Sequence, residues 1–93
     1  MTESSDTLYL KNLDDSVRSN ELRRTLYLLA CEYGPVLDVA LHKNEKGRGQ
    51  AWITFTGREA AVRALQGLND LSIYGKQIRA QNARSKPSVG KKR

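Results

Sequence analysis

The sequence predicts a single α+β domain in which two helices cover one face of a four-stranded antiparallel sheet. Three observations lead to this prediction. The chain has 93 residues, enough for one hydrophobic core. Four short segments suit strands, most of them alternating apolar with polar or aromatic side chains, and two longer segments carry apolar side chains at helical spacing. The segments follow one another in the order β-α-β-β-α-β.

The first predicted strand covers residues 8–12. Apolar Leu8 and Leu10 alternate with Tyr9 and Lys11, so we expect the leucines to face the core and the other two side chains to face outward. Turn-forming residues follow and end the strand.

A helix is predicted next, from a cap at Ser19 or Asn20 to Glu32. Gly34-Pro35 ends the helix, because proline lacks an N–H group and disfavours helical conformation in the residue before it. The stripe that we expect to face the core consists of Leu22, Leu26, Leu29 and Ala30.

The second and third strands are predicted at Val36–Leu41 and Gln50–Phe55, which are rich in β-branched, apolar and aromatic residues. Polar residues 43–47 form the loop between them. Side chains expected to face the core are Val39, Leu41, Ala51, Ile53 and Phe55. Those expected to face outward are Ala40, His42, Gln50, Trp52 and Thr54.

A second helix is predicted from Arg58 to Gln66, capped by Gly57 and ended by Gly67. Residues 73–76 suit a turn or short strand, and the last main strand covers residues 77–82. On the helix, the expected core residues are Ala61, Ala64, Leu65 and Leu68. On the last strand, Ile78 and Ala80 should face the core, and Arg79 and Gln81 should face outward.

The positive charge lies mostly at the C-terminal end. The net charge is +6, and seven of the 16 basic residues lie from Lys76 onward, where the sequence has no acidic residue. The first 75 residues carry nine basic and ten acidic residues, so most of the domain is close to neutral. We expect a flexible lead-in at residues 1–6, a folded domain at 7–84 and a basic flexible tail at 85–93.

The composition supports neither a membrane protein nor an enzyme. No apolar stretch approaches the ~20 residues that span a bilayer, and the polar, acidic start does not resemble a signal peptide. The one cysteine, Cys31, is expected to be a small buried side chain, and together with His42 alone it cannot complete a zinc site. Because no catalytic constellation can be assembled, we expect no enzymatic activity, no cofactor and no metal.

The sheet face opposite the helices is expected to carry two aromatic rings, Tyr9 and Trp52, among cations and amides. Such a flat surface suits unpaired nucleic acid, because bases stack on rings while amides read base edges and cations meet phosphates. Alternatively, the rings only cover the sheet beneath the C-terminal tail. The outward residues on this face are Tyr9, Lys11, Ala40, Gln50, Trp52, Thr54, Arg79 and Gln81.

Two segments resemble the paired motifs of a known family. Residues 48–55, Arg-Gly-Gln-Ala-Trp-Ile-Thr-Phe, resemble the octamer of the RNA recognition motif, K/R-G-F/Y-G/A-F-V-x-F/Y. Residues 8–13, Leu-Tyr-Leu-Lys-Asn-Leu, resemble its companion hexamer. The octamer departs at Gln50, where an aromatic is usual, and at Trp52, which replaces phenylalanine. The resemblance implies the ferredoxin-like β-α-β-β-α-β sandwich of that family.

Several further features are typical of one group within this family: Gln50 at the third octamer position, Glu21-Leu22 through Leu26-Tyr27 in the first helix, Tyr33-Gly34 after it, and Tyr74-Gly75-Lys76 with Arg79 near the last strand. On these residues the chain resembles the spliceosomal A and B-double-prime proteins of the U1 and U2 snRNPs, over about residues 7–84. The resemblance implies a nuclear protein of pre-mRNA splicing that holds the loop bases of an snRNA stem-loop on its sheet. It assigns base stacking to Tyr9 and Trp52. It also implies base reading by Asn12, Gln50 and Gln81, contact at the stem-loop junction by Arg48, and a place for Lys46 in the loop that threads the RNA loop. Arg84 occupies a position where a base-contacting lysine is usual. Lys11 and Arg79, as cations on the outward face, are expected to meet phosphates.

The B-double-prime branch is the closer resemblance for two reasons. Gly75 in Tyr74-Gly75-Lys76 stands where the A protein more often has aspartate, and Arg24 occupies a position where the B-double-prime branch also has arginine. Members of this branch bind a leucine-rich-repeat partner, the A-prime protein, through the first helix. The resemblance therefore makes Glu21 and Arg24 candidate contacts for this partner. Without the partner, we expect the protein to be a monomer. The alternative is that both are solvated helix charges.

Other functions remain open from the sequence. The chain could be a U1 A-type protein that binds a U1 snRNA stem-loop. It could also be a protein-interaction module built on the same fold, or a domain that binds single strands without regard to sequence. The two aromatic residues on the sheet favour RNA over the interaction module.

Overall fold

The computed structural model describes residues 6–41 and 49–83. The observed order of elements confirms the β-α-β-β-α-β prediction, with a two-strand hairpin before the last strand. The elements are β1 (Thr7–Lys11), α1 (Ser19–Cys31), β2 (Val36–Leu41), β3 (Ala51–Phe55), α2 (Arg58–Leu68), β4 (Ser72–Ile73), β5 (Lys76–Gln77) and β6 (Arg79–Ala83).

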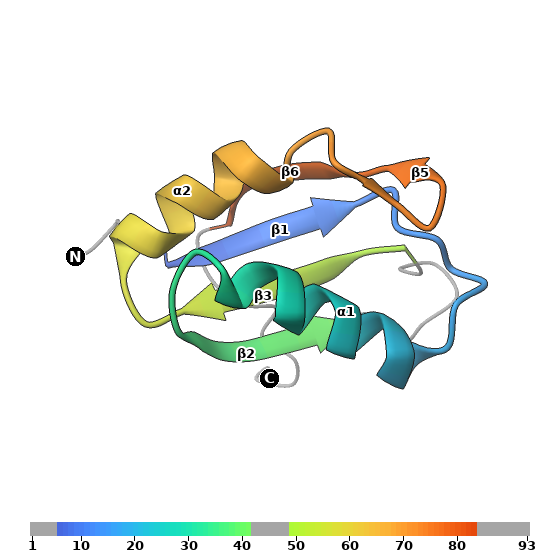
Figure 1. Ribbon diagram of the computed structural model, residues 1–93, viewed down its shortest axis with the longest axis horizontal. Helices are drawn as coiled ribbons and strands as arrows, with labels where there is room; N and C mark the ends of the chain where they lie inside the picture. Colours follow the sequence, from blue (N-terminus) through green and yellow to red (C-terminus); the bar gives the residue numbers. More distant parts are fainter. Residues whose placement is uncertain (1–5, 42–48, 84–93) are drawn as a thin grey trace, which may run out of the picture.

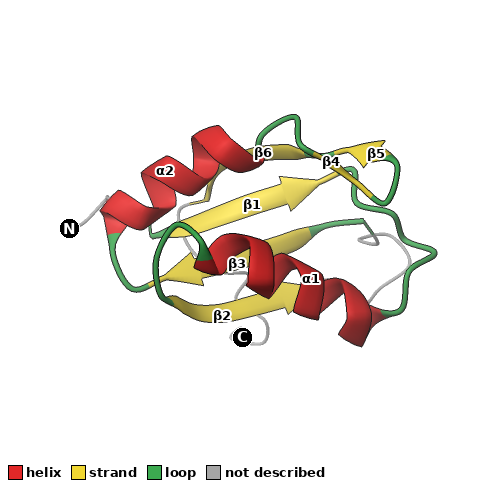
Figure 2. Cartoon of the chain, viewed as in Figure 1, coloured by secondary structure: helices red, strands yellow, loops and turns green. Residues whose placement is uncertain are grey.

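The main sheet has the strand order β2-β3-β1-β6, and each neighbouring pair is antiparallel. Both helices lie on the same side of this sheet (Figures 1 and 2), so its other side carries no helix. This arrangement confirms the ferredoxin-like α+β sandwich. We call the side of this sheet that faces away from α1 and α2 the open face.

The core lies between the sheet and the helices, and strand alternation decides which side chains enter it. In β1, Leu8 and Leu10 are fully buried, and in β3, Ile53 and Phe55 are fully buried as well. The intervening Tyr9 and Trp52 are only partly buried. The two rings therefore belong to the open face, as the period of two predicts. The buried helix residues are Leu22, Leu26, Ala30, Ala60, Ala61, Ala64 and Leu68.

The hairpin of β4 and β5 is closed by Tyr74 and Gly75, whose φ angles are 52° and 80°. Two consecutive positive φ angles are the geometry of a type I′ turn, which matches the twist of a two-residue hairpin. The Tyr74 hydroxyl lies 2.8 Å from the hydroxyl oxygen of Thr25 on α1. This hydrogen bond fastens the tip of the hairpin to the outer surface of the helix.

Four local expectations are wrong. The last main strand begins at Arg79 rather than at residue 77, because Gln77 pairs with Ser72 in the β4–β5 hairpin. The N-cap of α1 is Arg18, in extended conformation and without a side-chain cap bond, rather than Ser19 or Asn20. Cys31 is exposed rather than buried. The second helix does not end at Gly67 but continues to Leu68. A Cβ at position 67 would overlap the Tyr33 hydroxyl, so glycine is needed here for close packing and not as a helix stop.

The turn between β1 and α1 is held by Asp14. The Ser16 backbone N–H and hydroxyl donate to Asp14 Oδ1 over 3.0 and 2.7 Å. These two bonds favour the ionised carboxylate and lower the pKa of Asp14. The turn fixes the direction in which the chain leaves β1 and enters α1.

Some expectations fall outside the described residues. Residues 1–5, 42–48 and 84–93 are not described. These segments include the greater part of the predicted lead-in, the loop at 43–47, the basic tail, and His42, Lys46, Arg48 and Arg84. Their contributions therefore stay predictions.

Candidate nucleic-acid interface

A row of side chains crosses all four strands of the open face. Tyr9 on β1 is in register with Trp52 on β3 and with Gln81 on β6. Trp52 is in turn in register with Ala40 on β2. The row therefore runs Ala40, Trp52, Tyr9, Gln81, with the two large rings in the middle and a small side chain and an amide at the ends.

The two rings form a tilted pair. The ring centroids of Tyr9 and Trp52 are 5.2 Å apart and the ring planes meet at 38°. Directly opposed residues in antiparallel strands bring their side chains this close, so the register itself makes the pair. Both side chains are half-buried, which leaves part of each ring accessible to a base on the open face. The structure thus brings together the two residues that the sequence predicts for stacking.

Gln50 joins this pair through a hydrogen bond. The Tyr9 hydroxyl donates to Gln50 Oε1 over 2.9 Å. This bond fixes the amide beside the tyrosine ring, while the Gln50 NH₂ group can still donate two hydrogen bonds. An amide held at the edge of a stacking surface is suited to contact the edge of a stacked base.

Asn12 directly follows β1 and lies in the left-handed region, with a φ of 67°. Its Nδ2 donates to the carbonyl oxygen of Gln77 over 2.7 Å. This hydrogen bond connects β5 to the end of β1, so the Asn12 amide has a structural role in addition to the base reading predicted for it. A side-chain amide has two N–H donors and an acceptor oxygen, so this one bond leaves capacity for a base.

Gly49, the glycine of the octamer segment, packs closely against the backbone of the segment that follows β1. The Leu13 N–H donates to the Gly49 carbonyl over 3.0 Å, and Gly49 has a φ of 84°. A Cβ at this position would lie 3.1 Å from the Leu13 carbonyl oxygen. The close approach of the two motif segments therefore favours glycine at position 49.

The two described cations of the open face lie opposite each other. Lys11 on β1 is in register with Arg79 on β6. The Arg79 guanidinium forms an ion pair with Asp70, with an NH1–Oδ1 distance of 3.2 Å. The sequence predicts both cations but not the aspartate, because nine positions separate it from Arg79 and no local pattern connects them.

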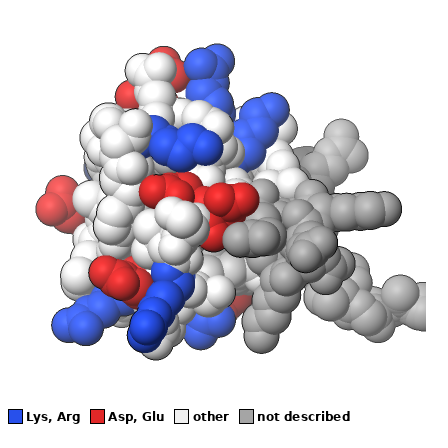
Figure 3. Space-filling model, turned by 90° about the vertical axis from the view of Figure 1, so that its right-hand side faces the viewer, with Lys and Arg blue, Asp and Glu red and all other residues white. Residues whose placement is uncertain are grey.

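Acidic and basic side chains are interleaved on the end of the domain that carries β5 and the start of α1. Acidic groups lie in the middle of this end, and basic groups lie above and below them (Figure 3). This distribution agrees with the nearly balanced charge of residues 1–75.

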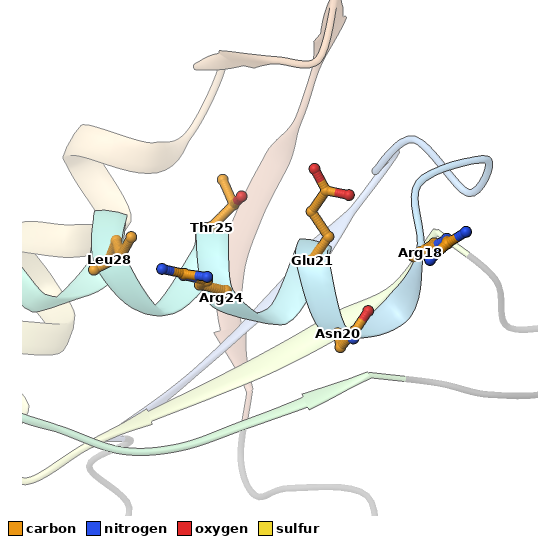
Figure 4. Close-up of a pocket in the computed structure, with 6 residues that line it drawn as sticks. All are labelled: Arg18, Asn20, Glu21, Arg24, Thr25 and Leu28. Carbon is orange, nitrogen blue, oxygen red and sulfur yellow. The ribbon is translucent and has the colours of Figure 1, made fainter.

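The candidate partner residues lie on the helix layer, away from the rings. Glu21 and Arg24 line a shallow groove of about 470 Å³ along α1, and both are exposed (Figure 4). In this view Glu21 and Thr25 point in the same direction, and Arg24 extends toward Leu28. The six residues that line the groove are Arg18, Asn20, Glu21, Arg24, Thr25 and Leu28.

The described residues offer no metal centre, since no group of three or more His, Cys, Asp or Glu side chains among them could hold a metal ion. A search of the same residues found no helix long and apolar enough to cross a membrane.

The fold and the paired rings on its open face define a class of protein. The RNA recognition motif family model matches residues 8–79, so the chain belongs to the RNA recognition motif family.

Within this family, the chain is similar to proteins of small nuclear ribonucleoproteins. The chain is 45% identical over 82 residues to the U2 small nuclear ribonucleoprotein B'' of Oryza sativa subsp. indica, covering 88% of the chain and 35% of the rice protein. It is 38% identical over 86 residues to the probable U2 small nuclear ribonucleoprotein B'' of Schizosaccharomyces pombe, covering 92% of the chain and 78% of that protein. The chain thus resembles the B'' group, as the motif residues predict, although it spans about a third of the rice relative.

A U1 protein is also among the relatives. The U1 small nuclear ribonucleoprotein usp102 of Schizosaccharomyces pombe is 39% identical over 85 residues, covering 91% of the chain and 34% of usp102. Among solved structures, the one titled "Structure of RNA15 RRM" superposes with a TM-score of 0.71 at 20% identity, covering 86% of this chain and 91% of the other. That likeness supports the fold.

Proposed function

We propose that this chain is a non-catalytic, nuclear RNA-binding component of the spliceosome that holds a U2 snRNA stem-loop, with residues 7–84 as the RNA-binding domain. The observation that carries the proposal is the tilted pair of Tyr9 and Trp52 on the open face. Rings in this position can stack successive bases of an unpaired loop, and such stacking is worth about 1–3 kcal/mol per base. The relatives named U2 small nuclear ribonucleoprotein B'' support U2 over other RNAs.

The remaining contacts are divided between base reading and phosphate binding. Gln50 and Gln81 flank the rings and would read base edges, with Asn12 at the end of β1. Lys11 and Arg79 would meet the backbone of the loop. The motif resemblance assigns further RNA contacts to three residues that lie outside the described part of the chain. These are Lys46, Arg48 and Arg84.

The direct test is a titration of the purified chain with a U2 snRNA stem-loop, a U1 snRNA stem-loop and an oligouridine of equal length. We expect the tightest binding to the U2 hairpin. Preference for the U1 hairpin would support the A-type alternative, which the resemblance to usp102 also favours. Equal binding of all three RNAs would indicate sequence-indifferent binding, and no binding to any of them would contradict the proposal.

The proposal includes a protein partner on α1, a leucine-rich-repeat A-prime protein. Glu21 and Arg24 both line the groove on the exposed surface of α1, in the helix layer on the other side of the sheet from the rings. A partner bound there would leave the open face accessible to RNA, so both ligands could be held at once.

Reversing the charge of Arg24 tests this surface. We expect Arg24→Glu to weaken binding of the purified A-prime protein at least about tenfold, since an unpaired charge is costly in an interface, and to leave binding of the U2 hairpin alone unchanged. Arg63→Glu, the same change at an exposed position of α2, is the matched control. Equal partner affinity of the two variants in a pull-down titration would assign Arg24 to a solvated helix charge.

A further inference from the structure

Asp70 is one of three non-glycine residues in the described part of the chain that have a positive φ angle, the others being Asn12 and Tyr74. Asp70 follows α2 with a φ of 70°, in the left-handed region. Its N–H donates to the Ile78 carbonyl over 2.8 Å, and its carbonyl accepts from Gln77 Nε2 over 3.3 Å. These bonds connect the end of α2 to the segment that leads into β6, and they hold the Asp70 backbone in place.

The neighbouring Asn69 strengthens the same connection. Asn69 Oδ1 accepts a hydrogen bond from the Ala80 N–H over 3.0 Å. The corner after α2 is therefore bound to the start of β6 through both residues. From this corner the Asp70 carboxylate reaches the guanidinium of Arg79, a residue of the edge strand β6.

The ion pair lies at the surface that we assign to RNA. The Asp70 and Arg79 side chains are 52% and 59% exposed, so a phosphate can reach the same guanidinium. Arg79 also faces Lys11 across the strand pair, and two like charges in register repel each other. The carboxylate offsets part of this local positive charge.

We propose that Asp70 is a specificity-determining residue that competes with RNA phosphates for Arg79, an inference that rests on the proposed function. Phosphate contacts add affinity for every RNA without regard to sequence. A carboxylate on Arg79 reduces this general affinity. Because a guanidinium has five N–H donors, one contact with Asp70 leaves others to meet a base that stacking has placed nearby.

The consequence for selectivity follows from how each RNA is held. A single strand without a fixed loop gains affinity mainly through its phosphates, so it loses most when Arg79 is partly neutralised. A loop whose bases stack on Tyr9 and Trp52 and meet the nearby amides depends less on any one phosphate. Asp70 thus widens the difference between a matching hairpin and unstructured RNA.

Asp70→Asn tests the inference, because asparagine also tolerates a positive φ and keeps the size of the side chain. We expect this variant to bind oligouridine about 1.4- to fivefold more tightly, the range that corresponds to an exposed ion pair. The slope of log K against log salt should steepen by about 0.7, the value for one more phosphate contact on a single strand. Affinity for the U2 hairpin should rise less, so the ratio of the two affinities should fall.

Two further variants isolate the role of Arg79. Glu59→Gln removes one negative charge from the first turn of α2, on the helix layer, and controls for the general effect of net charge. In an Arg79→Gln background, Asp70→Asn should raise oligouridine affinity no more than Glu59→Gln does, because Asp70 is proposed to act on RNA binding through the Arg79 guanidinium. Circular dichroism and thermal melting of every variant confirm that each compared protein is folded.

The outcomes separate this inference from the proposed function. If the unaltered chain binds the U2 hairpin but Asp70→Asn affects oligouridine no more than Glu59→Gln does, only the role of Asp70 is wrong. That role is also wrong if Asp70→Asn weakens oligouridine binding, since Asp70 would then position Arg79 rather than compete for it. If the unaltered chain binds no RNA, the proposed function fails and this inference fails with it.

Discussion

Trp52→Ala should weaken binding of the U2 snRNA hairpin by about 1–3 kcal/mol, the stacking energy of one base, which corresponds to a roughly 5- to 150-fold higher Kd. The indole lies next to Tyr9 on the open face, with centroids 5.2 Å apart, so its loss removes half of the stacking surface. The measurement is a filter-binding or fluorescence-anisotropy titration of the hairpin at fixed salt concentration.

Two controls separate stacking from folding. Trp52 is half-buried, so its removal also costs some stability, and binding must be measured at a temperature where thermal melting shows the variant to be folded. Trp52→Phe keeps a ring at the position and should retain most of the affinity, since phenylalanine is usual at this octamer position. Unchanged hairpin binding by folded Trp52→Ala would show that loop bases do not stack on Trp52.

The largest effect on stability is expected three positions further along the same strand. Phe55 is fully buried, and Phe55→Ala should lower the free energy of unfolding by about 3–5 kcal/mol, through lost burial and the cavity that remains. Urea denaturation followed by circular dichroism measures this change. A loss below about 1 kcal/mol would mean that Phe55 is not a main core residue.

The two variants on β3 should affect different properties, Phe55→Ala mainly stability and Trp52→Ala mainly RNA binding. Under conditions where Phe55→Ala remains folded, its hairpin affinity should be close to that of the unaltered chain, because its side chain lies on the opposite side of the sheet from the rings. Trp52→Ala should show the reverse pattern, with a large loss of binding and a smaller loss of stability. A strong binding defect in folded Phe55→Ala would show that core packing positions the rings as well.

The strands and helices could be predicted because each has an unambiguous periodicity. The alternation in Leu8-Tyr9-Leu10 and in residues 51–55 decides which side chains enter the core, and the structure agrees at every one of these positions. The pairing of Tyr9 with Trp52 follows once the two strands are known to be neighbours. Their register and their 5.2 Å separation required the structure.

What could not be predicted depends on contacts between distant segments. Gly67 resembles a helix stop in the sequence, but its role is set by the Tyr33 side chain, which comes from the end of the other helix. The Asn12 amide bonds to Gln77, 65 positions away. Asp70 meets Arg79 only because the corner after α2 is bound to the start of β6.

The local geometry of turns was only partly visible in the sequence. Tyr74-Gly75 could be assigned to a turn or short strand, and the structure shows a two-residue turn with both φ angles positive. The hydrogen bond from this turn to Thr25 on α1 could not be inferred, since it depends on how the hairpin folds back over the helix. The same limit applies to the α1 groove, which Thr25 also lines.

The intrinsic fluorescence of Trp52 tests the central claim most directly, because the chain has one tryptophan. During titration with the U2 hairpin, base stacking should quench this fluorescence, with saturation at one RNA per chain and a Kd that equals the value from anisotropy. Addition of Tyr9→Ala should weaken binding while leaving the sole tryptophan as the reporter. Hairpin binding that saturates by anisotropy with unchanged Trp52 fluorescence would contradict the claim that RNA bases stack on the open face.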